Sequence, residues 1–191
     1  PLLLIQRKRW EAMRRALGLI EYKSIARGVA ACDSMLKAGN VDLIAATILC
    51  PGKLVALVAG DVGAVTAAVK NGMAFDPAFA IADLVLPQVH PAVFPALTAT
   101  TAYEPEGAIG IIETMDAASG VIAGDTAAKA GNINLLEIRL ARGMGGKAFV
   151  HLCGELAAVE AAVQSTAVRL KDEGVVVATT VIASPHPQLT F

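Results

Sequence analysis

The sequence predicts two tandem copies of one α+β domain, each with a split βαβ arrangement of four strands and two helices. The first observation is an internal repeat. From residue 16 to residue 43, about half of the positions are identical to those about 92 residues later, with no gap. The second is the period, which is too long for a solenoid unit and suits a small domain. The third is that the same strand, helix and turn signals recur in the same order.

The first copy begins with a strand and a helix. A short apolar run at residues 17–22 predicts a buried strand. Ser24 is placed to cap a helix over residues 25–38, and Gly39 is expected to end it. The inward face of this helix is expected to carry the residues at three-to-four spacing, which are Ile25, Val29, Cys32 and Leu36.

The rest of the first copy supplies a hairpin, a second helix and a last strand. Strands at 41–49 and 53–59 are joined by a turn at Cys50-Pro51-Gly52. Asp61 is expected to cap the second helix, and residues 84–86 to form the last strand. The second helix is expected to contain Val62, Val65, Ala68 and Val69. This order is that of the ferredoxin-like fold.

The second copy repeats this order with one difference. Strands are expected from Ala108, Leu135 and Lys147 and over residues 175–182, and helices from Ala117 and Leu156. The turn between its middle strands is two residues longer, because Arg142-Gly143-Met144-Gly145-Gly146 stands where the first copy has Cys50-Pro51-Gly52. Folding alone does not require a cysteine in one copy and an arginine at the matching place in the other.

The composition is unusually apolar. Hydrophobic residues make up 55% of the chain and charged residues 17%, so burial between subunits is expected.

The longest stretch without a formal charge, residues 84–103, contains Pro87, Pro91 and Pro95. It is therefore interpreted as a strand and an inter-domain linker, and no membrane segment is expected. A net charge of −1 gives no sign of a nucleic-acid partner. Three cysteines without a paired spacing favour the reducing cytoplasm.

The repeated phrases resemble the bacterial microcompartment shell domain. They are Gly18-Leu19-Ile20-Glu21, the run from Ala31 to Val41, and Gly52-Lys53 before Gly60-Asp61-Val62. With both copies in one chain, the sequence is similar to the tandem-domain shell proteins, over about residues 16–187. The resemblance implies domains at 16–96 and 105–187 after a tail at 1–15. It also implies a homotrimer that mimics a hexamer and tiles with other shell proteins, in a compartment shell within the cytoplasm.

The same resemblance implies an iron–sulfur cluster at a central pore. The three Cys50 thiolates of a trimer would hold three irons of one [4Fe-4S] cluster and leave the fourth iron open. The cluster would pass electrons across the shell, with a redox enzyme inside as a candidate partner, or would itself be delivered through the shell. The expected pore-lining residues are Cys50, Pro51, Gly52, Arg142, Gly143, Met144 and Gly145. The expected tile-edge residues are Lys37, Asn40, Lys129 and Asn132.

Other interpretations stay open. Cys50 could be a small apolar turn residue, and Cys32 and Cys153 are expected in the core. Lys37 and Lys129 could simply stabilise helix C-termini. A metal role is not expected for the histidines, and the arginine of the usual family edge pattern is missing near His90 and His186. No enzyme is expected, because acids and bases form no catalytic motif. The rivals are a metal-free pore for metabolites, a ferredoxin-like regulatory oligomer that binds a small ligand, and a catalytic oxidoreductase.

Overall fold

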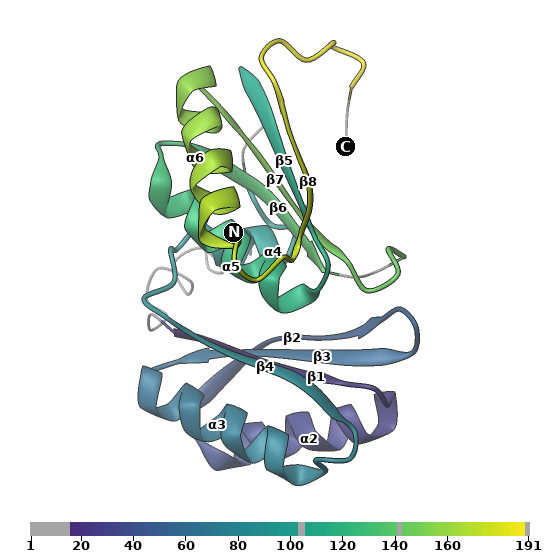
Figure 1. The fold of residues 1–191 in the computed structure, drawn as a ribbon. Helices are drawn as coiled ribbons and strands as arrows, with labels where there is room; N and C mark the ends of the chain where they lie inside the picture. Colours follow the sequence, from purple (N-terminus) through teal and green to yellow (C-terminus); the bar gives the residue numbers. More distant parts are fainter. Residues whose placement is uncertain (1–15, 103–105, 141–142, 190–191) are drawn as a thin grey trace. The chain divides into compact units, whose positions relative to one another are not determined.

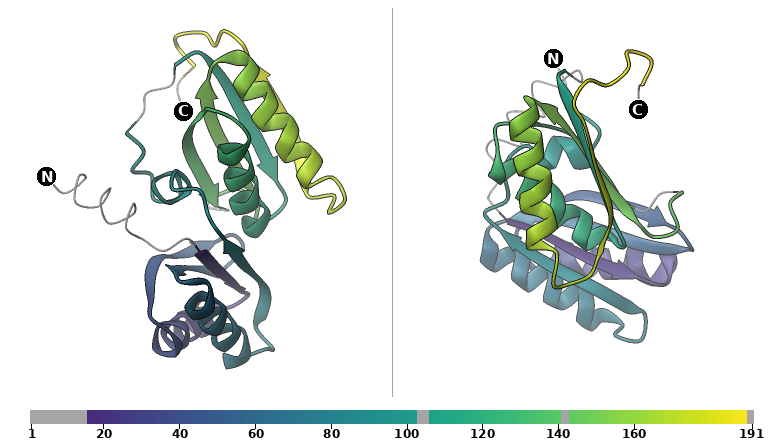
Figure 2. Two further views of the ribbon diagram at one scale, coloured as in Figure 1. Left: turned by 90° about the vertical axis from the view of Figure 1, so that its left-hand side faces the viewer. Right: turned by 45° about the horizontal axis from the view of Figure 1, so that its top comes forward.

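A computed structural model of the chain describes residues 16–102, 106–140 and 143–189. The expected tail at residues 1–15 therefore lies outside the described residues. The described residues divide into two compact units, one comprising 16–91 with 143–146, the other 92–102, 106–140 and 147–189. Each unit is a four-stranded sheet with its two long helices on one face (Figures 1 and 2).

The first unit has the predicted split βαβ topology. Its sheet order is β2-β3-β1-β4, so β3 lies between β1 and β2. Every neighbouring pair of strands is antiparallel. The elements are β1 (Ala16–Tyr22), α2 (Ile25–Ala38), β2 (Val41–Leu49), β3 (Lys53–Gly60), α3 (Val62–Phe75) and β4 (Ala80–Pro87). The order predicted from the sequence is confirmed.

The second unit repeats the first in its irregularities as well. Its sheet order is β6-β7-β5-β8, and the register shift between Leu135 and Glu137 matches the one between Leu43 and Ala45. Its elements are α4 (Val93–Leu97), β5 (Ala108–Thr114), α5 (Ala117–Ala130), β6 (Asn134–Leu140), β7 (Ala148–Gly154), α6 (Leu156–Arg169) and β8 (Val176–Ile182). A bulge kept in both copies re-aims the same edge strand, so the duplication extends to local geometry.

Helices pack closely on both sheets because glycine occupies the middle of each first strand. A Cβ on Gly18 would lie 2.6 Å from Val69 Cγ2 on α3, and one on Gly110 would lie 3.0 Å from Val159 Cγ1 on α6. Contacts this short are tighter than real side chains normally make, so a larger residue would push the neighbouring side chains away. The core of the first unit is formed between this helix-facing side of the sheet and α2 and α3.

The predicted inward face of α2 is wrong in three of its four residues. Cys32 is buried, but Ile25, Val29 and Leu36 are exposed, Val29 by 55%. The residues that α2 does bury are Gly28, Ala31, Cys32 and Met35. Gly28 allows close packing, because a Cβ there would lie 2.8 Å from Leu54 Cβ. The face of α2 that contacts the sheet is therefore made by small residues and Met35. The larger aliphatic residues lie outside this face and are exposed.

Helix α2 ends at Gly39, as predicted, but its backbone conformation does not require glycine. Gly39 is the C-cap residue, but its φ of −158° is extended and accessible to any residue. Glycine is needed there for space, because a Cβ would lie 2.8 Å from the carbonyl oxygen of Ala64. Gly131 at the end of α5 is also extended, and its Cβ would lie 3.1 Å from the carbonyl oxygen of Ala158. At the helix start, Ser24 caps as predicted by accepting from the Arg27 N–H at 3.4 Å. Asp61 is the N-cap residue of α3 but makes no side-chain cap hydrogen bond.

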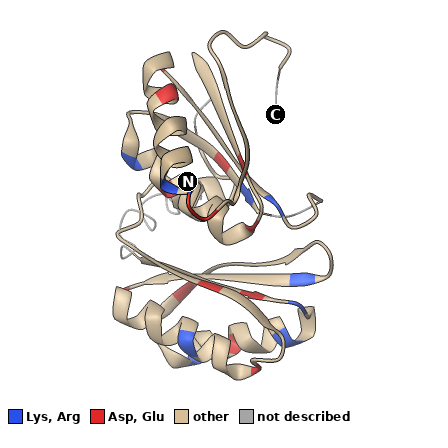
Figure 3. Ribbon diagram, viewed as in Figure 1, with Lys and Arg blue, Asp and Glu red and all other residues tan. Residues whose placement is uncertain are grey.

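The stretch expected to be only a linker contains a short helix, α4. Pro95 lies in its first turn, where a proline costs no helical hydrogen bond, so this proline, which argued against a membrane segment, is compatible with a short helix. Across residues 16–102, 106–140 and 143–189, no helix is long and apolar enough to cross a membrane. Charges of both signs are interspersed over these residues (Figure 3).

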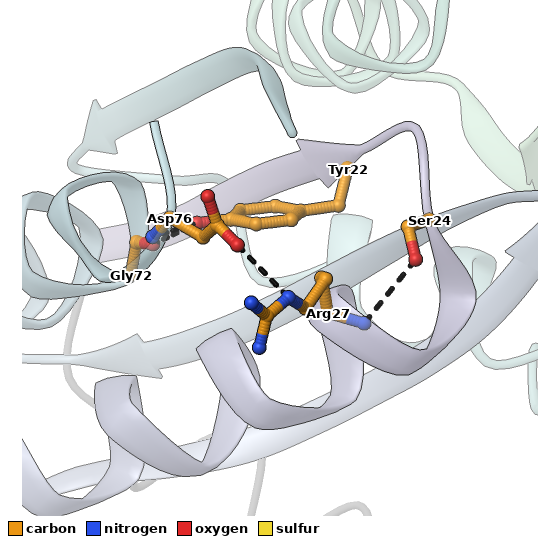
Figure 4. Close-up of polar contacts among 5 residues, drawn as sticks. All are labelled: Tyr22, Ser24, Arg27, Gly72 and Asp76. Carbon is orange, nitrogen blue, oxygen red and sulfur yellow. Dashed lines mark hydrogen bonds and ion pairs between the residues drawn. The ribbon is translucent and has the colours of Figure 1, made fainter. Parts of the chain in front are cut away.

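Tyr22 links the end of β1 to the end of α3 inside the first unit (Figure 4). Its hydroxyl donates to the carbonyl oxygen of Gly72 at 2.5 Å and accepts from the N–H of Asp76 at 3.3 Å. The Asp76 carboxylate pairs with Arg27 Nε on α2 at 2.9 Å. Burial raises the pKa of Tyr22, so the hydroxyl stays protonated and can donate. The three elements are thus tied together by one polar cluster.

Candidate functional site

The turn that carries Cys50 is short, and the residues on either side of it are paired in the sheet. Leu49 and Lys53 are paired across β2 and β3, so only Cys50, Pro51 and Gly52 lie between them. Leu49 is buried, Cys50 is half-buried, and the other two turn residues are exposed. The Cys50–Pro51 peptide bond is cis, and Gly52 has a φ of +78°, a conformation that favours glycine. The turn therefore places Cys50 at the end of the β2–β3 hairpin.

An ion pair anchors the end of this turn to the central strand. Lys53 Nζ lies 2.7 Å from Glu21 Oε1, and the Glu21 side chain is only 6% exposed. Glu21 is paired with Val55 across β1 and β3, so Lys53 lies diagonally opposite it on the same face. Because side chains alternate along strands, this is the face turned away from α2 and α3. Lys53 thus connects the turn to a buried carboxylate.

The matching turn of the second copy is two residues longer. Among the described residues, the last ladder pair before it is Leu140 with Ala148. Arg142, which was predicted to line the pore, lies outside the described residues. Gly143, Gly145 and Gly146 all have positive φ values, and Met144 is half-buried between them. Lys147 keeps the ion pair, with Nζ 2.9 Å from Glu113 Oε1, but the two side chains are 41% and 37% exposed.

The three cysteines have different surroundings. All are free thiols; Cys32 and Cys153 are buried, as predicted, and Cys50 is half-buried. Burial raises the pKa of Cys32, with a smaller effect from the Asp33 carboxylate, so this thiol is poorly suited to act as a thiolate ligand. Cys50 is the cysteine with access to a ligand from outside the unit.

Cys50 fits an iron–sulfur cluster only as one ligand among several. Thiolates are the usual protein ligands of such clusters, and Cys50 stands beside Gly52, where a Cβ would meet no atom within 4 Å. Over residues 16–102, 106–140 and 143–189, no three His, Cys, Asp or Glu side chains form a metal-binding group. A cluster at Cys50 therefore requires thiolates from other copies of the chain.

Comparisons with known proteins decide the family. The model of the BMC domain matches residues 16–89 and again residues 108–185. The chain belongs to the BMC-domain family. It is 36% identical, over 93% of its length and 96% of the relative's, to the bacterial microcompartment shell protein PduT of Citrobacter freundii. This BMC-domain protein is therefore a microcompartment shell protein, and its family is structural rather than catalytic.

Two solved structures resemble the BMC-domain chain over most of its length. A microcompartment protein from Desulfitobacterium hafniense superposes with a TM-score of 0.89 at 45% identity, covering 92% of this chain and 98% of that one. The fused permuted hexameric shell protein MSM0275 from the RMM microcompartment superposes with a TM-score of 0.60 at 19% identity, covering 90% of this chain and 91% of that one. The second likeness shows the fold alone.

The predicted tile-edge lysines each pair within their own helix. Lys37 Nζ lies 2.5 Å from Asp33 Oδ2, and Lys129 Nζ lies 2.6 Å from Asp125 Oδ2. The first pair is exposed, whereas the Asp125 side chain is 6% exposed. Asn40 and Asn132, the other expected edge residues, are both exposed and follow the C-caps. These positions are repeated in both BMC domains, and their role at a tile edge stays a prediction.

The histidines do not gather. His151 is buried in β7 opposite Glu137, and burial lowers its pKa although the Glu137 charge raises it in part. His90 is half-buried, and His186 is exposed and accepts from the Gln188 N–H at 3.2 Å. They lie in three separate places in the fold.

The two lysine–glutamate pairs are features of the site region that the sequence reasoning missed. Glu21 and Glu113 stand in one repeated phrase, and Lys53 and Lys147 in another, so both members were visible as repeats. Pairing them requires the register of the first and third strands of each unit, which places lysine two residues from the glutamate's direct partner. The repeated charge of opposite sign was the available signal.

Proposed function

We propose that three copies of this chain form a shell trimer whose central pore holds a [4Fe-4S] cluster through Cys50 of each subunit. Two homologous domains per chain give three chains six similar units, which can close a ring by head-to-tail contacts. One Cys50 per chain then supplies three thiolates around the threefold axis. Other shell proteins of the same compartment adjoin the trimer, and a redox enzyme inside the compartment is the proposed electron partner.

The observation that carries this proposal is the contrast between the two turns. The cysteine stands in only one copy, half-buried at the end of a closed hairpin, while the other copy has a longer, glycine-rich turn. The other two cysteines are buried within the sheet and helix layers. A thiolate needs a compensating positive charge, and metal binding provides it.

In this site the chain's own residues hold and orient the thiolate, and the cluster, when bound, supplies one-electron chemistry. Three cysteines leave one iron without a protein thiolate, which is therefore open to water, a small ligand or a partner. Binding also depends on assembly, because no single chain provides the ligand set. The function of the cluster is electron transfer or cluster delivery across the shell.

The test is anaerobic purification of the wild type and of Cys50→Ser, with Cys153→Ala as a matched control. We expect the wild type and Cys153→Ala trimers to show broad iron–sulfur absorption in the visible range. Cys50→Ser should assemble equally and be colourless. A wild type that remains colourless after iron and sulfide reconstitution removes the redox proposal.

A metal-free pore for metabolites is the second candidate, favoured by the greater length and the three positive-φ glycines of the second turn. It predicts that Cys50→Ser leaves spectra and permeation unchanged, while Met144→Trp alters permeation. Family membership favours both shell roles over a regulatory oligomer, which would form discrete particles and no sheets in electron micrographs.

A further inference from the structure

The ion pair between Lys53 and Glu21 lies at the base of the turn that carries Cys50. Lys53 is three residues after Cys50 and forms the ladder pair that closes the turn with Leu49. Its side chain is 28% exposed and ends 2.7 Å from a carboxylate that is 6% exposed. Neither side chain is a ligand for a cluster at Cys50, since the Lys53 amine pairs with Glu21 on the face of the sheet.

The backbone on both sides of Cys50 is thereby held by side chains. Before the cysteine, Leu49 is buried. After it, Lys53 is tied to the central strand β1, which is itself paired on both sides, with β3 and β4. Ligand side chains must be held within about 0.5 Å of their working geometry. In a site shared by three chains, a poorly fixed turn would misplace the Cys50 sulfur in every chain.

We propose that Glu21 and Lys53 are positioning residues that fix the Cys50 turn for cluster binding. The inference rests on the proposed function and assigns two residues to it. The second unit provides an internal comparison, because Lys147 and Glu113 form the same pair beside a turn without cysteine. The ion pair itself is common to both units, with Nζ–Oε1 distances of 2.7 Å and 2.9 Å.

The experiment measures release of cluster iron to a ferrous chelator from reconstituted trimers of each variant. The variants are Lys53→Met, Glu21→Gln, Lys53→Arg and Lys147→Met. Loss of a group that orients a metal ligand weakens metal binding by roughly 10–100-fold, so Lys53→Met and Glu21→Gln should release iron faster by about that factor. Lys53→Arg, which keeps the charge, should stay close to the wild type, and Lys147→Met should match it.

A control separates positioning from simple loss of stability. Met35→Ala removes a buried side chain from the helix side of the same unit, away from the turn, and should lower Tm. It should leave the iron-release rate unchanged. Equal release from Lys53→Met and Met35→Ala variants of similar Tm, or equal release from Lys53→Met and Lys147→Met, overturns the proposal.

A second readout uses the trimer without iron. Mild oxidation should join the Cys50 thiols of neighbouring chains, and no more than two chains of each trimer can be joined in one disulfide. Lys53→Met should slow this cross-linking, and Lys53→Arg should not. If wild-type trimers cross-link but never bind iron, the proposed function fails. The cross-linking rates of the Lys53 variants then still test whether Lys53 positions the Cys50 turn. If Lys53→Met cross-links at the wild-type rate, positioning fails on its own.

Discussion

Replacing Lys53 with methionine should cost far more stability than replacing Lys147. Removing one partner of a buried ion pair strands the other charge, which costs about 3–5 kcal/mol when burial is complete. Glu21 is 6% exposed, but Lys53 is 28% exposed, so water reaches the pair from the lysine side. We therefore expect a loss of about 2–3 kcal/mol for Lys53→Met. Lys147 and Glu113 are 41% and 37% exposed, so Lys147→Met should cost less than about 1 kcal/mol.

The assay is hydrogen exchange followed by mass spectrometry on peptides from β1 and β3, and from β5 and β7, at one trimer concentration. This reports the two units separately and holds the contribution of assembly fixed. Adding Glu21→Gln to Lys53→Met should recover part of the loss, because the stranded charge is gone. Equal losses for the two lysines, or no recovery in the double variant, would refute the reasoning that burial of the glutamate sets the cost.

Three further predictions concern the core of each unit. Tyr22→Phe should cost about 1–3 kcal/mol, because the Gly72 carbonyl and the Asp76 N–H lose a buried partner; an unchanged urea midpoint would contradict this. Gly18→Ala should cost about 1–3 kcal/mol by overpacking against Val69, measured as a lower Tm, and a neutral result would show that the helix moves freely. Burial lowers the pKa of His151, so the unfolded chain binds its proton more readily, and the free energy of unfolding should fall as pH drops below about 6.5. His151→Gln should flatten that dependence in denaturation curves at pH 7.5 and 5.5, and an unchanged slope would contradict it.

The duplicated fold could be predicted from the sequence because identical phrases recur at the same places in both copies. Apolar runs and turn residues then placed the strands and helices of the repeat to within a few residues. The buried face of α2 could not be predicted by spacing of large aliphatic residues, because Gly28 and Ala31 make the close contact. Small residues carry little weight in a hydrophobic pattern, yet they decide how near two elements can approach.

The candidate site was predictable only in part. The turn and its cysteine follow from the repeat and its one local difference in length. The anchoring of Lys53 to Glu21 depends on strand register, which joins residues 32 positions apart. The helix at Pro95 was missed because proline argues against a helix in general but is tolerated in a first turn. The convergence of three cysteines depends on contacts between chains and remains a prediction.

Native mass spectrometry of the anaerobically purified protein tests the central proposal most directly. The account predicts three chains carrying the mass of a single cluster of four irons and four sulfides, and a bare trimer for Cys50→Ser. A wild-type trimer that stays bare after reconstitution would contradict the account. A cluster retained by Cys50→Ser, or an assembly whose number of chains is not a multiple of three, would contradict it equally.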